Sequence, residues 1–437
     1  MKPELECVRH EARWFESEQG GFEALVNAIG DARVVLIGEA SHGTHEFYRT
    51  RAELTRELIA RRGFNVIAVE ADWPDAYRVN RWVRGASDDS SAEQALGDFV
   101  RFPRWMWRNT DVVEFTAWLR ERNLRTPEAE RVGFYGLDLY SLHRSIEAVL
   151  AYLAKVDPED ARRARERYSC FEMFGGDPQA YGYASTRGFS ADCEDEVTAQ
   201  LVDLRRRALD YANRDGRIAA DEYFFAEQNA RLVANAETYY RAMFGSHVQS
   251  WNVRDRHMME TLESLVQHTG RESKAVVWAH NSHLGDARAT QMASSGELNL
   301  GQLVRERFNG EAFLIGFTTH TGTVTAARNW DDPAERRHVR PSLPGSYEHL
   351  FHETDISQFL LLLRDGPARQ ALWTERLERA IGVIYRPESE RVSHYFRARL
   401  PQQFDAVLHI DRTTALEPLE RWAVEEADLP ETYPSGV

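Results

Sequence analysis

Four short apolar runs in the chain each break off into glycine or ionisable residues. A continuous apolar run of four or five residues is typical of a strand buried on both faces of a parallel sheet. The runs cover 34–37, 66–69, 132–136 and 275–278, and they lead respectively to Glu39 and His42, to Glu70 and Asp72, to Asp138, and to His280 and His283. The pattern therefore predicts an α/β protein whose strands carry polar side chains to one edge of the sheet.

Helical spacing of apolar residues fills the stretches between these runs. It predicts helices over 11–29, over 44–62 before Gly63, from Pro74 through Val83, and over 111–124. Repeated strand–helix–strand order implies parallel strands joined by right-handed crossovers. Later apolar runs predict further strands at 313–317, 381–385 and 404–409.

From about residue 141 to 268 the strand pattern stops and charge-rich helical periodicity replaces it. Two segments there, 192–213 and 219–244, are long enough to form an antiparallel helical hairpin. We therefore predict an α/β fold with a mainly parallel central sheet flanked by helices. Residues 1–140 and 271–437 form its two halves, and 141–270 form a large all-helical insertion that acts as a lid or second lobe.

Composition narrows the class of protein. The 437 residues include 43% hydrophobic and 28% charged side chains, as in an ordinary globular protein, and the net charge is −15. A nucleic-acid binder needs a concentrated basic surface, so none is expected as a partner. No stretch approaches the roughly 18 apolar residues of a membrane span, and the charged amino terminus does not resemble a signal peptide. We expect a cytoplasmic protein without a membrane partner.

The three cysteines, Cys7, Cys170 and Cys193, are far apart and lack C-x-x-C spacing. This pattern suggests neither a disulfide framework nor a thiolate metal site. We expect buried or incidental thiols.

The polar residues after the strands form the candidate site, because ligands of open parallel sheets bind beyond the carboxyl ends of the strands. His42 lies at a strand-to-helix turn and can act as a general base on water, since the pKa of imidazole is near neutrality. By itself a histidine there is more often a helix cap or a surface residue, but the acids and the His280/His283 pair favour a functional role. If the first two strands pair, Glu39 and Glu70 end neighbouring strands and can share a proton or hold a positive group.

Several nearby residues admit two interpretations. Arg51 lies nine residues after His42, almost opposite in helical phase, which by itself favours a solvated position. Large aromatic residues mostly belong to the core, yet Trp73 and Trp107 adjoin the strand-end loops and can line an apolar cleft. The expected substrate-binding residues are Asp72, Trp73, Trp107 and Asp138.

The three histidines also allow a second interpretation of the site, as a metal-binding site. His42, His280, His283 and an acid would offer nitrogen and oxygen ligands suited to zinc, iron or manganese. However, the H-x-x-H spacing lacks the glutamate of the H-E-x-x-H signature, so a metal is not indicated. The G-x-S-x-G and G-x-x-x-x-G-K-[ST] motifs are absent as well, which argues against a standard serine hydrolase and a P-loop NTPase.

The combined spacing resembles that of the erythromycin esterase family, whose members share a G-E-x-x-H element after the first strand and a late H-x-x-H element. The matching residues are Gly38-Glu39-Ala40-Ser41-His42, then Arg51, then Glu70, then His280 and His283. The resemblance implies a metal-independent hydrolase, without a cofactor, that opens macrolide lactones with histidine-activated water. It further implies that His42 is the base and that the other matched side chains order water and substrate.

The sequence hypothesis is a hydrolase of a small-molecule carboxylic ester or macrocyclic lactone. In it His42 activates water, while His280 or His283 with Arg51 stabilises the oxyanion. Two alternatives stay open at this point: a metal-dependent hydrolase that uses the same His/Glu cluster, and a non-catalytic protein that binds a ligand or a haem-like group.

Overall fold

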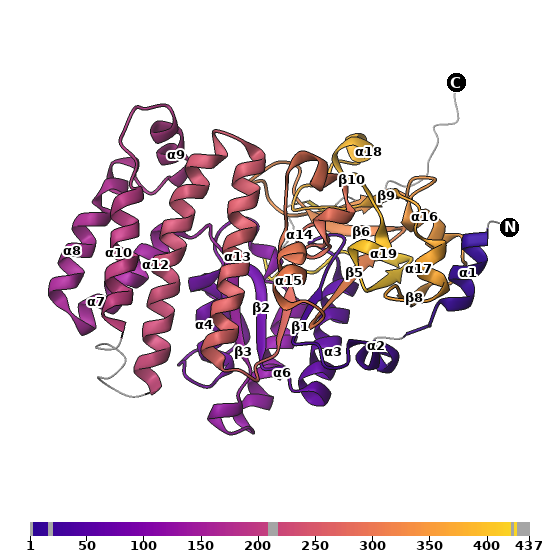
Figure 1. Cartoon of the computed structure of the whole chain (residues 1–437), viewed down its shortest axis with the longest axis horizontal. Coiled ribbons are helices and arrows are strands. Elements are labelled where there is room, and N and C mark those ends of the chain that lie inside the picture. The colour runs from indigo at the N-terminus through magenta and orange to yellow at the C-terminus, as the bar shows by residue number, and fades with distance from the viewer. Residues whose placement is uncertain (1–2, 16–20, 209–216, 421–423, 426–437) are drawn as a thin grey trace.

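A computed structural model of the chain describes residues 3–15, 21–208, 217–420 and 424–425. Within these residues the centre of the fold is a seven-stranded sheet, shown in Figure 1, which confirms the predicted mainly parallel α/β architecture. All neighbouring strands are parallel except β8, which runs antiparallel to β11 at one edge. In spatial order the strands are β3 (Gly133–Asp138), β2 (Val66–Asp72), β4 (Ala275–Trp278), β1 (Val34–Ile37), β5 (Ala312–Thr318), β11 (Ala406–Ile410) and β8 (Gln358–Leu362).

Successive residues of the central strands pack into two separate cores, which is why these strands read as unbroken apolar runs. In β1, Val34 and Leu36 join one core, and Val35 and Ile37 join the other. The first core includes side chains of α13 (His247–Thr269) and α15 (Leu300–Phe308). The second core includes side chains of α2 (Glu23–Ile29), α3 (His45–Arg62), α4 (Trp73–Val83) and α6 (Thr110–Leu124).

The condition under which Glu39 and Glu70 would end neighbouring strands is not met, because β4 lies between β1 and β2 and pairs with both. A strand from residue 275 onward therefore separates two strands that are close in sequence. Apolar runs specify burial, but they do not specify which of several similar strands become neighbours. Glu39 and Glu70 consequently follow strands that are not adjacent.

In the described part of 141–270 the regular elements are all helices, joined by turns and loops. Most of these helices stand beside the sheet rather than over its strand ends, as Figure 1 shows, whereas α13 packs along β2 and β3. The helices are α7 (Leu142–Val156), α8 (Pro158–Tyr168), α9 (Pro178–Thr186), α10 (Glu194–Arg206), α12 (Arg217–Met243) and α13. The predicted hairpin is formed by α10 and α12, which pack together.

The C-terminal part adds two small sheets that the sequence pattern did not predict. One contains β12 (Arg412–Thr413), β6 (Thr321–Ala326), β7 (Glu335–Val339) and β13 (Val424–Glu425), and the other contains β10 (Tyr395–Ala398) and β9 (Arg376–Arg379). The strand predicted at 381–385 is wrong, because this segment forms isolated bridges to Ser41 and Ala327 instead. Short helices here are α16 (Tyr347–His352), α17 (Pro367–Ala371), α18 (Glu390–Ser393) and α19 (Leu400–Gln403).

Two further expectations are corrected. The helix predicted over 11–29 is instead α1 (Pro3–Glu11) and the separate α2, and Gly21 between them has a left-handed φ of 95° that an α-helix does not contain. Cys170 and Cys193 form a disulfide, and Cys7 is the free thiol, so the expectation of isolated thiols was wrong for two of the three. No helix within the described part of the chain combines the length and apolarity of a membrane span.

Candidate active site

The turn that follows β1 is held in place by close backbone contacts. A Cβ atom at Gly38 would come within 2.2 Å of the Asn281 side chain, and one at Gly43 within 1.8 Å of the Thr325 carbonyl oxygen. The Asn281 N–H donates to the Glu39 carbonyl at 2.8 Å, and the His42 N–H donates to the Ile381 carbonyl at 3.3 Å. Glycine is therefore required at both positions, because the backbone carrying Glu39 and His42 is packed against three other segments.

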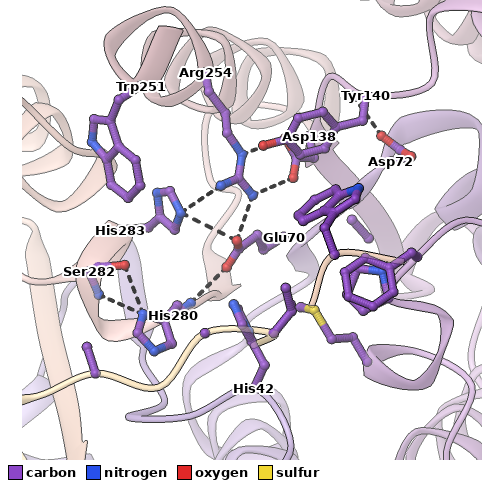
Figure 2. A pocket seen from close by; sticks show the side chains of 18 of the residues that line it. His42, Glu70, Asp72, Asp138, Tyr140, Trp251, Arg254, His280, Ser282 and His283 are labelled. Carbon is purple, nitrogen blue, oxygen red and sulfur yellow. Dashed lines mark hydrogen bonds and ion pairs between the residues drawn. The ribbon is translucent and has the colours of Figure 1, made fainter. Parts of the chain in front are cut away.

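Glu39 and His42 form a buried carboxylate–imidazole pair. His42 Nδ1 lies 2.9 Å from Glu39 Oε1. We assign a proton to Nδ1, since a carboxylate accepts hydrogen bonds, and this leaves Nε2 as an acceptor on the pocket side of the ring. Figure 2 shows the His42 ring pointing into the pocket toward Glu70 and His280. A histidine held in this tautomer is equipped to remove a proton from water.

Arg51 lies behind this pair rather than in the pocket. Its Nη2 is 2.8 Å from Glu39 Oε2, and its guanidinium lies over the Tyr48 ring at 4.2 Å from the centroid. The side chain is 1% exposed, so the solvated interpretation was wrong. The helical phase argument failed because His42 precedes α3 and Arg51 reaches Glu39, not His42. A contact between Arg51 and an oxyanion is equally inconsistent with its position outside the pocket lining.

Glu70 occupies the centre of the site (Figure 2). Its Oε1 accepts from Arg254 Nη2 at 2.7 Å and lies 3.4 Å from His283 Nε2, while Oε2 accepts from the backbone N–H of His280 at 2.9 Å. Burial alone would raise the pKa of Glu70, but His283, Arg254 and His42 hold this pKa below its ordinary value. Glu70 is thus an ionised carboxylate, and it does not share a proton with Glu39.

His280 is a neutral ring beside His42. Its Nδ1 accepts from the backbone N–H of Ser282 at 3.2 Å and lies 2.8 Å from the Ser282 hydroxyl, so we assign the proton to Nε2. Burial, together with the neighbouring His42, lowers the pKa of His280 well below its ordinary value. The two ring centroids are 4.8 Å apart. The buried Nε2 makes no hydrogen bond of regular geometry among the described residues, although the Ala40 backbone is close enough to affect the pKa of the ring.

His283 is held on both ring nitrogens by consecutive residues of α13. Nδ1 lies 3.0 Å from the Asp255 carboxylate, and Nε2 accepts from Arg254 Nη1 at 2.9 Å. Trp251 stacks on the ring face at 4.5 Å between centroids. Burial would lower the pKa of His283, but Asp255 and Glu70 raise it above its ordinary value.

The pocket over these residues has a volume of about 500 Å³ and mostly apolar walls. Of the expected site residues, it is lined by His42, Glu70, His280, His283, Asp72, Asp138 and Trp107. Asp72 pairs with Arg101 at 2.6 Å, and Asp138 pairs with Arg254. Trp73 does not line the pocket, because its ring packs in the core against Tyr135 and Phe225.

Asp75 is an unexpected acid in the pocket wall. It pairs with Arg144 in a short contact, yet burial and the nearby Asp72 raise the pKa of Asp75 to about 8. The sequence offered no reason to distinguish it from other helix acids.

Of the three pocket histidines, His283 has no ring nitrogen free for a metal ion, whereas His42 and His280 are each held through Nδ1. His42 Nδ1 bonds a carboxylate, His280 Nδ1 bonds Ser282, and both nitrogens of His283 are engaged. In the described parts of the chain, no group of three or more His, Cys, Asp or Glu side chains is arranged to hold a metal ion.

Sequence reasoning missed Arg254, Asp255 and Trp251, which α13 brings to the site. They occur in a long amphipathic helix whose other charged side chains face solvent or neighbouring helices. Nothing in the spacing separates Arg254 from the many other arginines of the insertion, so no sequence signal could have identified it.

The sequence model of the erythromycin esterase family matches residues 59–413. This segment begins within α3 and includes Glu70, Arg254, His280 and His283. The chain belongs to the erythromycin esterase family. The match confirms the resemblance inferred from the G-E-x-x-H and H-x-x-H elements, although the first of these lies before residue 59.

Relatives within and around the erythromycin esterase family span almost the whole chain. Erythromycin esterase type II of Escherichia coli is 21% identical over 412 residues, which cover 91% of this chain and 93% of the relative. Erythromycin esterase type I of the same organism is 25% identical over 332 residues, covering 71% and 76%. The putative hydrolase YbfO of Bacillus subtilis is 21% identical and covers 89% of this chain and 86% of its own.

Solved structures share the fold. A succinoglycan biosynthesis protein superposes with a TM-score of 0.75 at 20% identity, covering 95% of this chain and 97% of the other. A mutant of the erythromycin esterase EreC in its open conformation superposes with a TM-score of 0.68 at 18% identity, covering 93% and 96%. The erythromycin esterase family fold is therefore present over nearly the full length.

Proposed function

We propose that the protein is a carboxylic ester hydrolase in which His42 activates the attacking water. The observation that carries this proposal is the buried Glu39–His42 pair, whose free nitrogen faces a pocket with apolar walls. A carboxylate behind a histidine fixes the tautomer of the ring and compensates the positive charge that the ring acquires when it takes a proton. Membership of the erythromycin esterase family supports the same class of reaction.

In the proposed reaction, His42 Nε2 removes a proton from water, and the hydroxide oxygen forms a bond to the ester carbonyl carbon. The tetrahedral intermediate then collapses, the carbon–oxygen bond to the leaving alcohol breaks, and His42 returns its proton to that oxygen. Neutral His280 avoids placing a second positive charge beside the protonated His42. Its Nε2–H, which makes no hydrogen bond of regular geometry among the described residues, is the donor that we assign to the carbonyl oxygen, in place of Arg51.

The proposed substrates are small-molecule esters with a bulky apolar part, including macrocyclic lactones. The wall of the pocket contains aromatic and sulfur-containing side chains, among them Phe99, Phe102, Met106, Trp107 and Phe396. Such a wall binds apolar surface without specific hydrogen bonds. Erythromycin esterases by name act on one such lactone, so macrolides belong in the first substrate panel. The mechanism as proposed requires neither a metal nor an organic cofactor.

Replacement of the base tests the proposal directly. His42→Ala should lower kcat by about a thousandfold on any ester that the wild type cleaves, because a positioned base contributes roughly 10²–10⁴-fold. Circular dichroism and thermal melting should stay close to wild type, since His42 is at the pocket edge of the fold. His10→Ala, which alters a histidine with 86% side-chain exposure, is the matched control and should leave kcat unchanged.

The alternatives give different results in the same assay. Activity lost to a chelator and restored by zinc, iron or manganese would favour a metal-dependent hydrolase. Saturable binding of a lactone or haem without turnover, across a broad panel of esters and lactones, would favour a binding protein. Full hydrolysis by His42→Ala would refute the assignment of the base.

A further inference from the structure

One side chain of the helical insertion, Arg254, connects three separate parts of the site. Its guanidinium donates to Glu70 at 2.7 Å, to both carboxylate oxygens of Asp138 at 2.6 and 3.0 Å, and to His283 Nε2 at 2.9 Å (Figure 2). Glu70 lies near the end of β2, Asp138 is the last residue of β3, and His283 comes after β4. The side chain is 13% exposed, and its ring contact with Tyr140, at 5.0 Å from the centroid, further limits its movement.

Charge explains why an arginine is needed there. Glu70 and Asp138 are both buried carboxylates, and Arg254 is the cation that contacts the two of them. The other titratable groups around Glu70 are His42 from the turn after β1 and His280 and His283 from the segment after β4, and the His280 contact is a backbone hydrogen bond. A planar guanidinium can bind two acids and a ring nitrogen at once, whereas a lysine ammonium has no such fork.

The next residue, Asp255, fixes the other side of the same imidazole. Both of its oxygens lie 3.0 Å from His283 Nδ1, and Oδ1 also accepts from the backbone N–H of Leu300 at 2.8 Å. Since Arg254 can only donate, His283 Nε2 must accept, and the proton must reside on Nδ1. The two consecutive residues of α13 therefore permit one tautomer and one ring orientation.

We propose that Arg254 and Asp255 are positioning residues of the hydrolase, which hold the Glu70 carboxylate and the His283 ring in their working geometry. The helical insertion then supplies residues that the catalytic centre requires, and it is not only a lid over that centre. This inference rests on the proposed function for its catalytic consequence. The tautomer of His283 follows from the contacts alone and can be measured without a substrate.

The kinetic test compares Arg254→Met and Arg254→Lys with Arg256→Met, which alters an exposed arginine on the same helix. Arg254→Met should lower kcat by about 100-fold, as loss of a supporting contact commonly does. It should also raise the pH at which the Glu70 carboxylate titrates by about one pH unit, as read by carbon-13 NMR, because Glu70 loses a close positive charge. Arg254→Lys should keep the Glu70 titration near that of the wild type and still lose kcat, because it keeps the positive charge but cannot bind two acids and a ring nitrogen at once.

Arg256→Met should match wild type in both measurements. Equal kcat and an unchanged Glu70 titration in Arg254→Met and Arg256→Met would overturn the role of Arg254. Absence of turnover in the wild type would count against the proposed function, and the following measurement still decides the inference in that case.

Nitrogen-15 NMR of histidine-labelled protein reports the tautomer directly. In the wild type we expect the His283 proton on Nδ1. In the double variant with Arg254→Met and Asp255→Asn, the Leu300 N–H should keep the side-chain oxygen, so that the amide NH₂ faces Nδ1 and no arginine faces Nε2; the proton should then move to Nε2, beside Glu70. A wild-type His283 with its proton on Nε2, or an unchanged tautomer in this double variant, would overturn the proposal.

Discussion

At the scale of single residues, Arg51 shows how a buried charge can serve a site without reaching it. Its guanidinium contacts Glu39 and lies against the rings of Tyr48 and Trp278. Glu39 therefore has a permanent cation on one side and the His42 ring on the other. Glu39 is thus held from both sides, and Arg51 contributes to the position of His42 through it.

Removal of Arg51 should be costly for the fold. Arg51→Met leaves the Glu39 charge buried without its cation, and breaking such a pair typically costs about 3–5 kcal/mol of unfolding free energy. Adding Glu39→Gln should recover part of that loss, because the unbalanced charge is then gone. Urea unfolding of the two single variants and the double variant measures the coupling. Arg61→Met, which breaks a half-exposed pair with Glu57, should change stability by less than about 1 kcal/mol.

At the scale of elements, the helical insertion is tied together by more than its apolar core. The Cys170–Cys193 disulfide connects the segment after α8 to the start of α10. It closes a loop between two cysteines that are 23 residues apart in the sequence. Tyr181 of α9 lies within this loop, and its hydroxyl accepts from the Cys193 N–H and donates to Glu237 of α12. The loop is thus attached to the long helix α12, which in turn packs on α13.

Loss of the disulfide should weaken this lobe. A loop of this size is expected to contribute about 3 kcal/mol by restricting the unfolded chain. The variant with Cys170→Ala and Cys193→Ala should therefore melt at a lower temperature than the wild type, and a reductant should lower the melting temperature of the wild type but not that of the double variant. Cys7→Ala is the control. Equal melting of the double variant and the control would show that the disulfide adds no stability.

At the scale of the whole molecule, burial of uncharged histidine makes stability depend on pH. His257 of α13 is 2% exposed, and burial lowers its pKa to about 4. The unfolded state takes up a proton near pH 6.5, whereas the folded state resists protonation until about pH 4. The stabilisation is therefore complete above pH 6.5 and is lost as the pH falls toward 4.

Replacing His257 with glutamine should flatten this dependence. Between pH 6.5 and 4 the wild type should lose up to about 3 kcal/mol more unfolding free energy than His257→Gln, as the linkage of proton binding to folding requires. Denaturant unfolding at several pH values gives the unfolding free energy of each protein as a function of pH. The same pH dependence in wild type and His257→Gln would show that His257 is not the group responsible.

The sequence predicted those parts of the molecule that depend on local periodicity. The apolar runs 34–37, 66–69 and 275–278 predicted buried strands. The pocket is lined by the polar residues that come after these runs, namely His42, Glu70, His280 and His283. Strand order was not predictable, because every central strand has the same apolar character. Arg254 was not predictable either, because an inward-facing arginine becomes distinct only when a helix is placed against the sheet. Trp73 was assigned to the pocket because it follows β2, but the direction of its side chain placed it in the core.

The position of β4 has a consequence for the order in which the protein can be assembled. The two strands that flank it, β1 and β2, lie within the first 72 residues, and β4 begins at Ala275. During synthesis, some two hundred residues must therefore be translated after β2 before β4, the strand that pairs with both β1 and β2, leaves the ribosome. Until then their inner edges are unpaired, and such edges invite contacts with other chains. Truncated forms that end before β4 should accordingly accumulate as aggregates and depend on chaperones.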